Sequence, residues 1–314
     1  MNLTEIYEGA GEELAYFMTH VLQDVLPAIY QDEIKYCKAV IDDYETTTDL
    51  SKTWSNMKKY FQNEINDDSQ VTGDCFIMSY AVLKRLQLEA KNTQNLKSDI
   101  TKQAPIFNPD IFYLCKSEIK DSQEDHVAIC ANFKNKNHKS DEGYVLLDIG
   151  LFILRALIIR PNKLEESFLG GFHTQQFLTP DSSTIISIRT HQKNSKISFY
   201  YPKKGLNMND CIDLMEKGIK MQKTFKLKKI NAKNDTILKM EIKYENSDWI
   251  CSVVYAYKKY NLTIKANDIV HINPKIKNLD QQILGEIENI SLIKFDDLKE
   301  LLKKLQQCNY INFK

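Results

Sequence analysis

Apolar side chains at helical spacing dominate the first 90 residues of the chain. One set recurs every three or four positions, at Leu14, Phe17, Met18, Val21, Leu22 and Val25. A second set follows the same rule, at Leu50, Trp54, Met57 and Phe61. Such stripes are typical of amphipathic helices that bury one face. Thr47, Thr48 or Asp49 would cap the second helix, and a third helix would run over residues 71 to about 90.

The middle of the chain changes to strand-like patterns. Short runs rich in β-branched and aromatic residues cover 110–114, 125–133, 144–151 and 185–189. Residues 134–143 between two of these runs are charged and polar, which predicts a hairpin loop. An antiparallel sheet is therefore expected here.

The last third mixes both patterns. Helices are predicted over 210–221 and in a C-terminal segment that begins near Asp296. Residues 225–227 and 238–244 alternate apolar and polar positions, as half-buried strands do. Residues 249–257 and 262–265 are also strand-like. The chain is expected to be an α+β protein in three parts: a helical domain over 1–90, a β-rich domain over 91–205, and an α/β lid over 206–314.

Composition narrows the possible partners. The 314-residue chain has 42 Lys and Arg against 42 Asp and Glu, so its net charge gives no reason to bind nucleic acid or an anionic membrane. With 43% hydrophobic residues, it is expected to be a globular protein. Its most apolar stretch, 144–159, is too short to span a bilayer and contains Asp148 and Arg155.

Cysteine use and the N-terminal residues bear on the cellular compartment. The seven cysteines are scattered and form no Cys-x-x-Cys pair, which favours neither a zinc site nor a disulfide framework. The first residues are polar and acidic, unlike the basic start and apolar core of a signal peptide. We therefore expect reduced thiols, no bound metal and a cytoplasmic location.

Cys75 is the strongest candidate for chemistry. It follows Gly73 and opens the predicted helix at 71–90. The N–H groups at a helix N-terminus favour negative charge there, and this lowers the pKa of a thiol and makes the reactive thiolate more abundant. The backbone N–H groups of Cys75 and Phe76 would also suit part of an oxyanion hole.

His126 and Asp148 are the expected partners of this cysteine. His126 would begin one strand and Asp148 would end the next, and an antiparallel hairpin brings those two ends together. An imidazole can take a proton from the thiol and return it to a leaving group, while a carboxylate fixes the tautomer of the imidazole. A carboxylate inside an apolar strand also needs a buried partner, and the structural alternative is a salt bridge to Arg155 or Arg160.

Three short motifs, within residues 60 to about 190, resemble one enzyme family. Residues 73–76 (Gly-Asp-Cys-Phe) are similar to a Gly-x-Cys-Phe nucleophile motif, residues 126–129 (His-Val-Ala-Ile) to a His-Val-x-Leu strand, and residues 147–152 (Leu-Asp-Ile-Gly-Leu-Phe) to an Asp-Val-Gly-Phe segment. These are features of the arylamine N-acetyltransferases, which belong to the wider transglutaminase-like and papain-like group of thiol enzymes.

The resemblance implies both a fold and an activity. The fold would be a helical N-terminal region, a papain-like Cys-His-Asp core in an antiparallel β-rich middle, and a sheet-and-helix lid. The activity would be a ping-pong transfer of an acetyl or acyl group from acetyl-CoA, or another acyl-CoA, to a small-molecule amine. Cys75 would carry the acyl group as a thioester, His126 would move protons and Asp148 would orient His126.

Two other functions remain open. The same triad would serve a transglutaminase-like or cysteine-protease-like enzyme whose acyl donor is a peptide or glutamine side chain. The chain also lacks the Arg-Gly-Gly that usually precedes the cysteine in the family, and the Glu and Asn that follow it. This departure keeps open a non-catalytic interaction protein on a thiol-enzyme fold.

Weaker candidates lie elsewhere in the chain. His173 and its neighbour Phe172 follow two glycines and are candidate substrate contacts from a loop, although a loop histidine with no such role is the simpler interpretation. The remaining cysteines are interpreted as small buried side chains: Cys37, Cys115, Cys130, Cys211, Cys251 and Cys308.

Overall fold

The structure of the chain is a computed structural model, and the protein divides into two compact units. The described residues are 5–25, 30–66, 72–95, 105–121, 125–138, 140–151, 153–169, 172–191, 194–221, 224–230, 235–271 and 281–308. The first unit comprises Met1–Ile29, Ile65–Val71 and Cys75–Leu214, and the second comprises Tyr30–Glu64, Thr72–Asp74 and Met215–Lys314. Each unit is described by itself.

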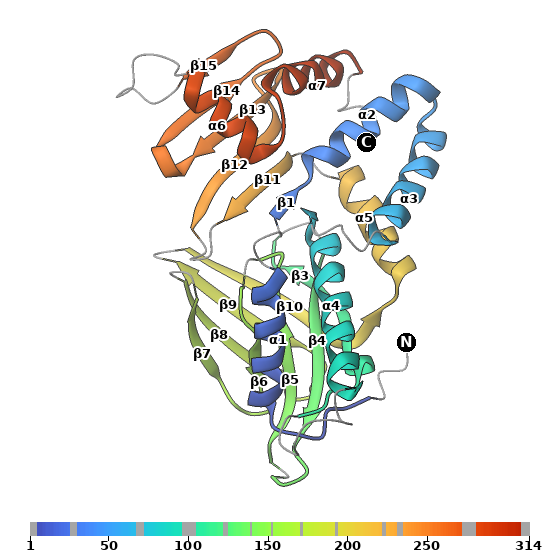
Figure 1. Cartoon of the computed structure of the whole chain (residues 1–314), viewed down its shortest axis with the longest axis vertical. Coiled ribbons are helices and arrows are strands. Elements are labelled where there is room, and N and C mark those ends of the chain that lie inside the picture. Colours follow the sequence, from blue (N-terminus) through green and yellow to red (C-terminus); the bar gives the residue numbers. More distant parts are fainter. Residues whose placement is uncertain are drawn as a thin grey trace. The chain divides into compact units, whose positions relative to one another are not determined.

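An antiparallel sheet forms most of the first unit. Its strand order is β6-β5-β4-β3-β10-β9-β8-β7, and it curves so that β6 and β8 also touch (Figure 1). The bounds are Phe112–Ile119 for β3, Asp125–Lys134 for β4, Glu142–Leu147 for β5, Leu157–Ile159 for β6, Glu165–Leu169 for β7, Phe172–Leu178 for β8, Ile185–His191 for β9 and Asn194–Leu206 for β10.

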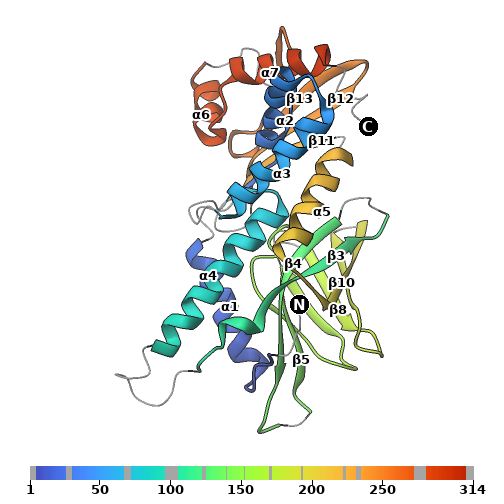
Figure 2. The same ribbon diagram turned by 90° about the vertical axis from the view of Figure 1, so that its right-hand side faces the viewer.

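Two helices pack on one face of this sheet. Helix α1 (Gly11–Val25) contacts β4, β5 and β6, and α4 (Cys75–Asn95) contacts β3 and β4 (Figure 2). The apolar stripe of α1 is buried at Leu14, Met18, Val21 and Leu22, as its helical spacing predicted. Burial of such stripes, at roughly 1.5–3 kcal/mol for each large apolar side chain, is what holds both helices to the sheet.

Side chains that alternate along the strands gather on one face of the sheet and form a buried core there. Cys115 of β3, Ala128 and Cys130 of β4, and Leu146 of β5 lie in one buried cluster, because every second residue of a strand points to the same face. The predicted hairpin at 134–143 is present, and it pairs β4 with β5 in the register Ile129 opposite Leu147.

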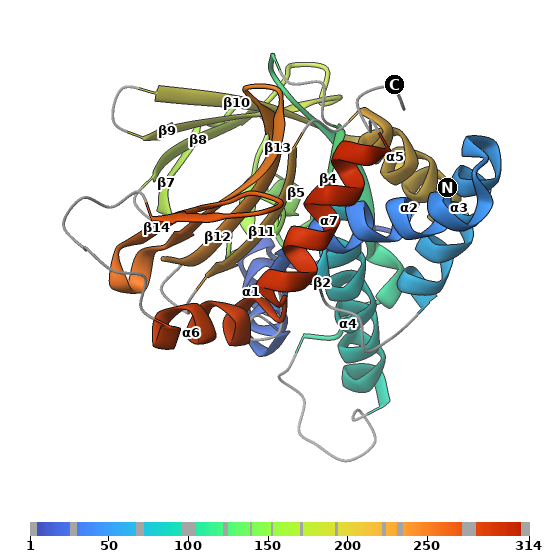
Figure 3. The same ribbon diagram turned by 90° about the horizontal axis from the view of Figure 1, so that it is seen from above.

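The second unit is also a sheet with helices. Its strands run in the order β15-β14-β13-β12-β11-β1-β2, and their bounds are Tyr30–Asp32 for β1, Thr72–Gly73 for β2, Thr224–Ile230 for β11, Thr236–Glu245 for β12, Asp248–Tyr255 for β13, Tyr260–Ile264 for β14 and Ile269–His271 for β15. Helix α2 (Ile34–Thr47) contacts β11, α6 (Gln281–Ser291) contacts β12, and α7 (Phe295–Gln307) contacts β13 and α2 (Figure 3).

Two further α-helices lie in the described part of the chain, beside the short 3₁₀ helices Pro109–Ile111 and Ala256–Lys258. The first of these α-helices confirms a predicted cap. Helix α3 (Leu50–Asn66) begins after Asp49, whose carboxylate Oδ1 accepts the N–H of Ser51 at 2.9 Å. Helix α5 (Met208–Met221) covers the segment predicted at 210–221. No helix among the described residues is long and apolar enough to cross a membrane.

The α+β class predicted from the sequence is confirmed, with helices and mostly antiparallel strands in each unit. The expectation that residues 1–90 form a helical domain is wrong at β1, which is a strand. Its residues pair with β2 on one side and with β11 on the other, so partners distant in the chain decide the conformation of three residues. The three-part division at residues 90 and 205 stays a prediction.

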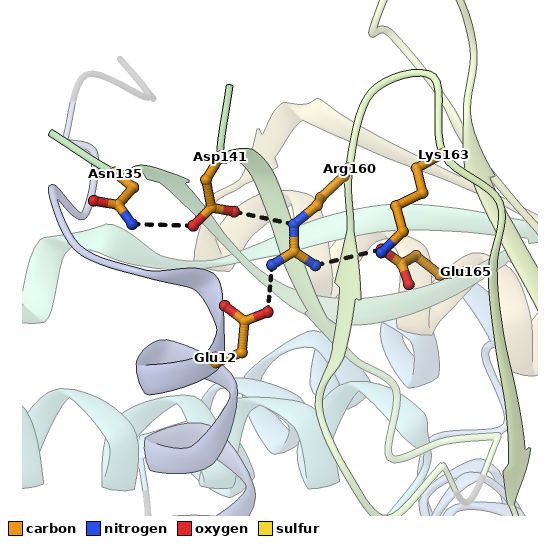
Figure 4. A network of polar contacts seen from close by, with 6 residues as sticks. All are labelled: Glu12, Asn135, Asp141, Arg160, Lys163 and Glu165. Carbon is orange, nitrogen blue, oxygen red and sulfur yellow. Dashed lines mark hydrogen bonds and ion pairs between the residues drawn. The ribbon is translucent and has the colours of Figure 1, made fainter. Parts of the chain in front are cut away.

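A polar network ties four segments of the first unit together around Arg160 (Figure 4). The guanidinium donates from Nε to Asp141 Oδ1 at 3.0 Å and from Nη1 to Glu165 Oε1 at 3.3 Å, and it also bonds to Glu12 of α1. Asn135 completes the network by donating to Asp141 at 3.1 Å. Because only 18% of the Arg160 side chain is exposed, these contacts are screened less by water than an ordinary surface ion pair.

Replacing Arg160 by methionine is expected to destabilise the first unit by about 1–3 kcal/mol, because Asp141 loses its cation, whereas Glu165 keeps its ion pair with Lys163. The matched control is Lys134→Met, which removes an exposed ion pair with Glu142 and is expected to change stability by less than about 0.5 kcal/mol. Urea denaturation of both variants measures the difference. Equal losses would contradict the structural role given to Arg160.

Candidate active site

Cys75 is the first residue of helix α4, the position that the sequence predicts for it. The short strand β2 precedes it, and its Thr72 and Gly73 pair with β1. The side chain of Cys75 is half-buried, whereas Phe76 beside it is buried. A thiol at this place is accessible and lies in the positive field of the helix N-terminus.

His126 and Asp148 meet in a buried hydrogen bond. The distance from His126 Nε2 to Asp148 Oδ1 is 2.7 Å, and the exposed side-chain fractions are 6% and 0%. The β4–β5 hairpin explains this meeting, because His126 lies at the start of β4 and Asp148 directly follows β5. Burial of a carboxylate without a partner is costly, so the pair also stabilises the end of the hairpin.

Asp148 has two partners besides the imidazole. The hydroxyl of Tyr200 donates to Oδ2 at 2.7 Å, and the backbone N–H of Leu151 donates to Oδ1 at 2.9 Å. Burial alone would raise the pKa of the carboxyl, but His126 and these two donors outweigh it, so that the pKa lies below its ordinary value. Asp148 is therefore a carboxylate at neutral pH.

The alternative of a structural salt bridge to Asp148 is contradicted by these contacts. Arg160 binds Asp141, Glu12 and Glu165 instead, and the side chain of Arg155 is exposed. Among the described residues, His126 is the side chain whose nitrogen lies within ion-pair distance of the Asp148 carboxylate.

Strand register accounts for the position of Tyr200. Tyr200 of β10 lies opposite Ser117 of β3, and Ser117 lies opposite His126 of β4. The three side chains thus form one row across three strands, on one face of the sheet. A register shift in the pairing of β10 with β3 begins directly after Tyr200, so the last residue of the regular ladder is the one that reaches Asp148.

Gly150 lies between the thiol-bearing residue and the imidazole. A Cβ placed on Gly150 would lie 2.2 Å from His126 Cε1 and 2.5 Å from the Cβ of Cys75. Both atoms therefore border the same small space, and Cys75 is a close neighbour of the His126 ring. Only a residue without a side chain leaves room for this approach.

The same geometry assigns the two ring nitrogens of His126. An ionised carboxylate only accepts hydrogen bonds, so Nε2 carries the proton that it shares with Asp148. In the neutral ring, Nδ1 is then the acceptor, and this atom lies on the side of Gly150, 3.2 Å from where its Cβ would be. The basic nitrogen of His126 thus faces the side on which Cys75 lies.

The two weaker candidates, His173 and Phe172, lie in a strand. His173 lies in strand β8 and not in a loop, and its Nε2 is 3.7 Å from Glu166 of the neighbouring strand β7. The backbone of Phe172 begins β8, but its side chain is outside the described part of the structure. A role of either residue in substrate binding stays a prediction.

The remaining cysteines are poor nucleophiles. Cys308 is half-buried, and the others are buried at Cys37, Cys115, Cys130, Cys211 and Cys251. Burial raises the pKa of the Cys251 thiol to about 12 and also raises that of Cys308. The structure describes all seven cysteines and none forms a disulfide. No cluster of His, Cys, Asp or Glu suited to a metal ion occurs in the described part of the chain.

No protein-family model and no curated protein matches the chain. Solved structures similar to it include the M. smegmatis arylamine N-acetyltransferase, with 9% identity, 96% of this chain and 92% of that chain covered, and a TM-score of 0.44. The M. tuberculosis arylamine N-acetyltransferase has 10% identity, 96% coverage of both chains and a TM-score of 0.44. The M. marinum enzyme in complex with CoA has 7% identity, 75% and 76% coverage, and a TM-score of 0.36. These proteins carry the family name that the sequence motifs suggested.

Two contacts of the site were not predicted from the sequence. Tyr200 gives no local signal, because its role depends on the register of β10 against β3. Gly150 belongs to a motif that was noted for Asp148, yet its function as a spacer between Cys75 and His126 is visible only in three dimensions.

Substitution of Gly150 by alanine is expected to displace the His126 ring. With the imidazole displaced, the Cys75 thiolate loses its partner, and alkylation by iodoacetamide at neutral pH should slow roughly tenfold. Gly285→Ala is the matched control, because a Cβ at Gly285 meets nothing within 4 Å. An unchanged alkylation rate in a folded Gly150→Ala variant would contradict the proximity of thiol and imidazole.

Removal of the Tyr200 hydroxyl tests the support of Asp148. Tyr200→Phe leaves Oδ2 without this donor, and we expect a loss of about 1–3 kcal/mol at pH 7. Since the hydrogen bond lowers the Asp148 pKa, the variant has a higher folded-state pKa. When the solution is acidified, the variant should therefore lose the stability that depends on the ionised Asp148 carboxylate at a higher pH than the wild type does.

Urea denaturation at pH 7 and at acidic pH measures both effects. The control is Tyr201→Phe, which removes a hydrogen bond to Glu118 from a half-buried hydroxyl next in the chain and should cost less than about 1 kcal/mol. Identical pH profiles for the two variants would show that Tyr200 does not support the carboxylate.

Proposed function

We propose that this protein is a cysteine-dependent acyltransferase with Cys75 as nucleophile, His126 as general acid and base, and Asp148 as the residue that orients His126. The observation that carries the proposal is the 2.7 Å contact of Asp148 with Nε2 of a buried imidazole whose Cε1 and Nδ1 border the same space as Cys75. This is the relation of nucleophile, base and orienting group that nucleophilic catalysis requires.

In the first half of the reaction, Cys75 gives its proton to Nδ1 of His126. The thiolate attacks the carbonyl carbon of the donor, and the His126 imidazolium returns the proton to the leaving group as the donor bond breaks. The products are a Cys75 thioester and the protonated leaving group. The Asp148 carboxylate stabilises the imidazolium formed on the way, and the N–H groups at the start of α4 suit the developing oxyanion.

In the second half, an amine attacks the thioester carbonyl. His126 accepts a proton from the nitrogen, the amide forms, and Cys75 leaves as a thiolate that regains its proton from His126. Donor and acceptor occupy the site in turn, so the kinetics should be ping-pong. The chain's own residues supply each proton transfer, and the site residues noted here call for no metal.

The motifs at 73–76, 126–129 and 147–152 favour acetyl-CoA or another acyl-CoA as the donor and a small aromatic amine as the acceptor. The chain has no Arg-Gly-Gly before Cys75 and no Glu and Asn after it, so its acyl donor can differ from that of the family. A peptide or glutamine donor would use the same three residues, so the experiment must separate the donors.

Incubation of the protein with acetyl-CoA, longer acyl-CoA esters and a glutamine peptide, followed by intact-mass spectrometry, tests the proposal. We expect one acyl group on Cys75 from a CoA ester, absent in Cys75→Ala and formed about 10²–10⁴ times more slowly in His126→Gln. The Cys308→Ser background removes the other half-buried thiol. An acyl-enzyme formed only from the peptide would establish the transglutaminase-like or protease-like activity instead.

Thiol labelling across a pH range separates an enzyme from a non-catalytic protein of the same fold. An activated Cys75 should label with an apparent pKa well below the ordinary thiol value of about 8.5. A Cys75 that titrates at that ordinary value, together with no acylation by any donor, would refute the proposed activity.

A further inference from the structure

A separate cavity lies within the second unit. It has a volume of about 200 Å³ and is bordered by the start of α2 and by the connection between α6 and α7, and α2 also packs against α7. Its apolar wall consists of Ile34, Leu292, Ile293, Leu298 and Leu301. All of its lining residues belong to the second unit, whereas Cys75, His126 and Asp148 belong to the first.

At this cavity, in the described part of the chain, the positively charged side chains have ion-pair partners and the negatively charged ones do not. The two lysines that line it already have anionic partners, since Lys35 pairs with Glu64 and Lys38 pairs with Asp42. The two lining carboxylates, Asp32 and Asp297, have no cation within ion-pair distance among the described residues. The cavity therefore has apolar walls and a surplus of negative charge.

Asp32 is the buried member of this pair. Only 8% of the residue is exposed, and its Oδ1 accepts the backbone N–H of Lys35 at 3.3 Å. Burial raises its pKa, and the charges of Lys35 and Lys229 offset this only in part. A carboxyl group kept from water in this way gains most from a cation that enters the cavity with it.

The rim of the cavity has a second unusual feature. Leu292 is 74% exposed, and its φ of 62° lies in the left-handed region that a leucine rarely adopts. Leu292 directly follows α6, and its backbone N–H donates to the Glu288 carbonyl oxygen at 2.8 Å, so the left-handed conformation ends this helix and fixes Leu292 at the rim. An exposed leucine at the mouth of an apolar cavity would be covered by a ligand with an apolar body.

We propose that this cavity binds a small organic amine, with its ammonium group beside Asp32 and Asp297 and its aromatic or alkyl body against Leu298, Leu301 and Ile293. The size is suitable, because an apolar protein cavity of roughly 150 Å³ accommodates a benzene ring. An organic anion would meet two carboxylates and two lysines that are already paired. A neutral ligand would add no positive charge beside Asp32.

The test uses the full chain with 2-phenylethylamine as the probe. Ile34 and Ile293 line the cavity, so their methyl NMR signals report binding there independently of any binding near Cys75. We expect saturable shifts of both signals with the amine, and at least tenfold weaker binding of 2-phenylethanol and 3-phenylpropanoate, which have similar bodies without the positive charge. Equal binding of the three probes, or no shift with the amine, would overturn the proposal.

Three variants test which carboxylate contributes to binding of the amine. Asp32→Asn should weaken amine binding about tenfold or more, because the buried carboxylate contributes most, and Asp297→Asn about threefold, because its carboxylate is exposed. The matched control is Asp296→Asn, next in the chain, which is 97% exposed, pairs with Lys299 and does not line the cavity; it should leave binding unchanged.

If Asp32→Asn does not fold, Asp297→Asn still tests whether the carboxylates select the amine. An Asp297→Asn variant that binds the amine as tightly as Asp296→Asn, with no preference over 2-phenylethanol, would show that the carboxylates do not select the ligand. The proposal is independent of acyl transfer, because the Cys75→Ala variant should bind the amine at this cavity as the wild type does.

Discussion

The buried carboxylate of Asp148 is the constraint on which the candidate site depends. A charge with no exposed side-chain surface is tolerated only when several donors surround it. Here an imidazole, a phenol hydroxyl and a backbone N–H supply them from strand β4, strand β10 and the segment after β5. The orientation of His126 is thus a consequence of satisfying this carboxylate, and the direction of its basic nitrogen follows from that orientation.

The rest of the first unit holds these groups in register. Pairing of β10 with β3 and of β3 with β4 fixes the row that contains Tyr200, Ser117 and His126. The network around Arg160 connects the β4–β5 loop to helix α1 and strand β7, and so restrains the far end of the same hairpin. Gly150 then allows Cys75 to approach the ring. The contacts that stabilise the sheet are thus the same ones that position the proposed catalytic groups.

Local patterns were sufficient to predict part of this arrangement. The helix at Cys75, the hairpin between His126 and Asp148, and the α+β class all follow from periodicity, loop composition and the cost of an unpaired carboxylate in an apolar strand. Tyr200 could not be predicted, because 52 residues separate it from Asp148 and only the strand order brings it near. Strand β1 was missed for the same reason: its partners β2 and β11 are far away in the sequence, and three residues carry too weak a periodicity to reveal it.

The protonation pattern of His126 reports whether Asp148 orients the imidazole. Nitrogen-15 NMR of the imidazole at neutral pH should show the proton on Nε2, with a strongly downfield signal from its hydrogen bond to Asp148, and an unprotonated Nδ1. The downfield signal should disappear in Asp148→Asn. A proton on Nδ1 of the wild-type ring, or a signal that persists unchanged in Asp148→Asn, would show that Asp148 does not orient His126.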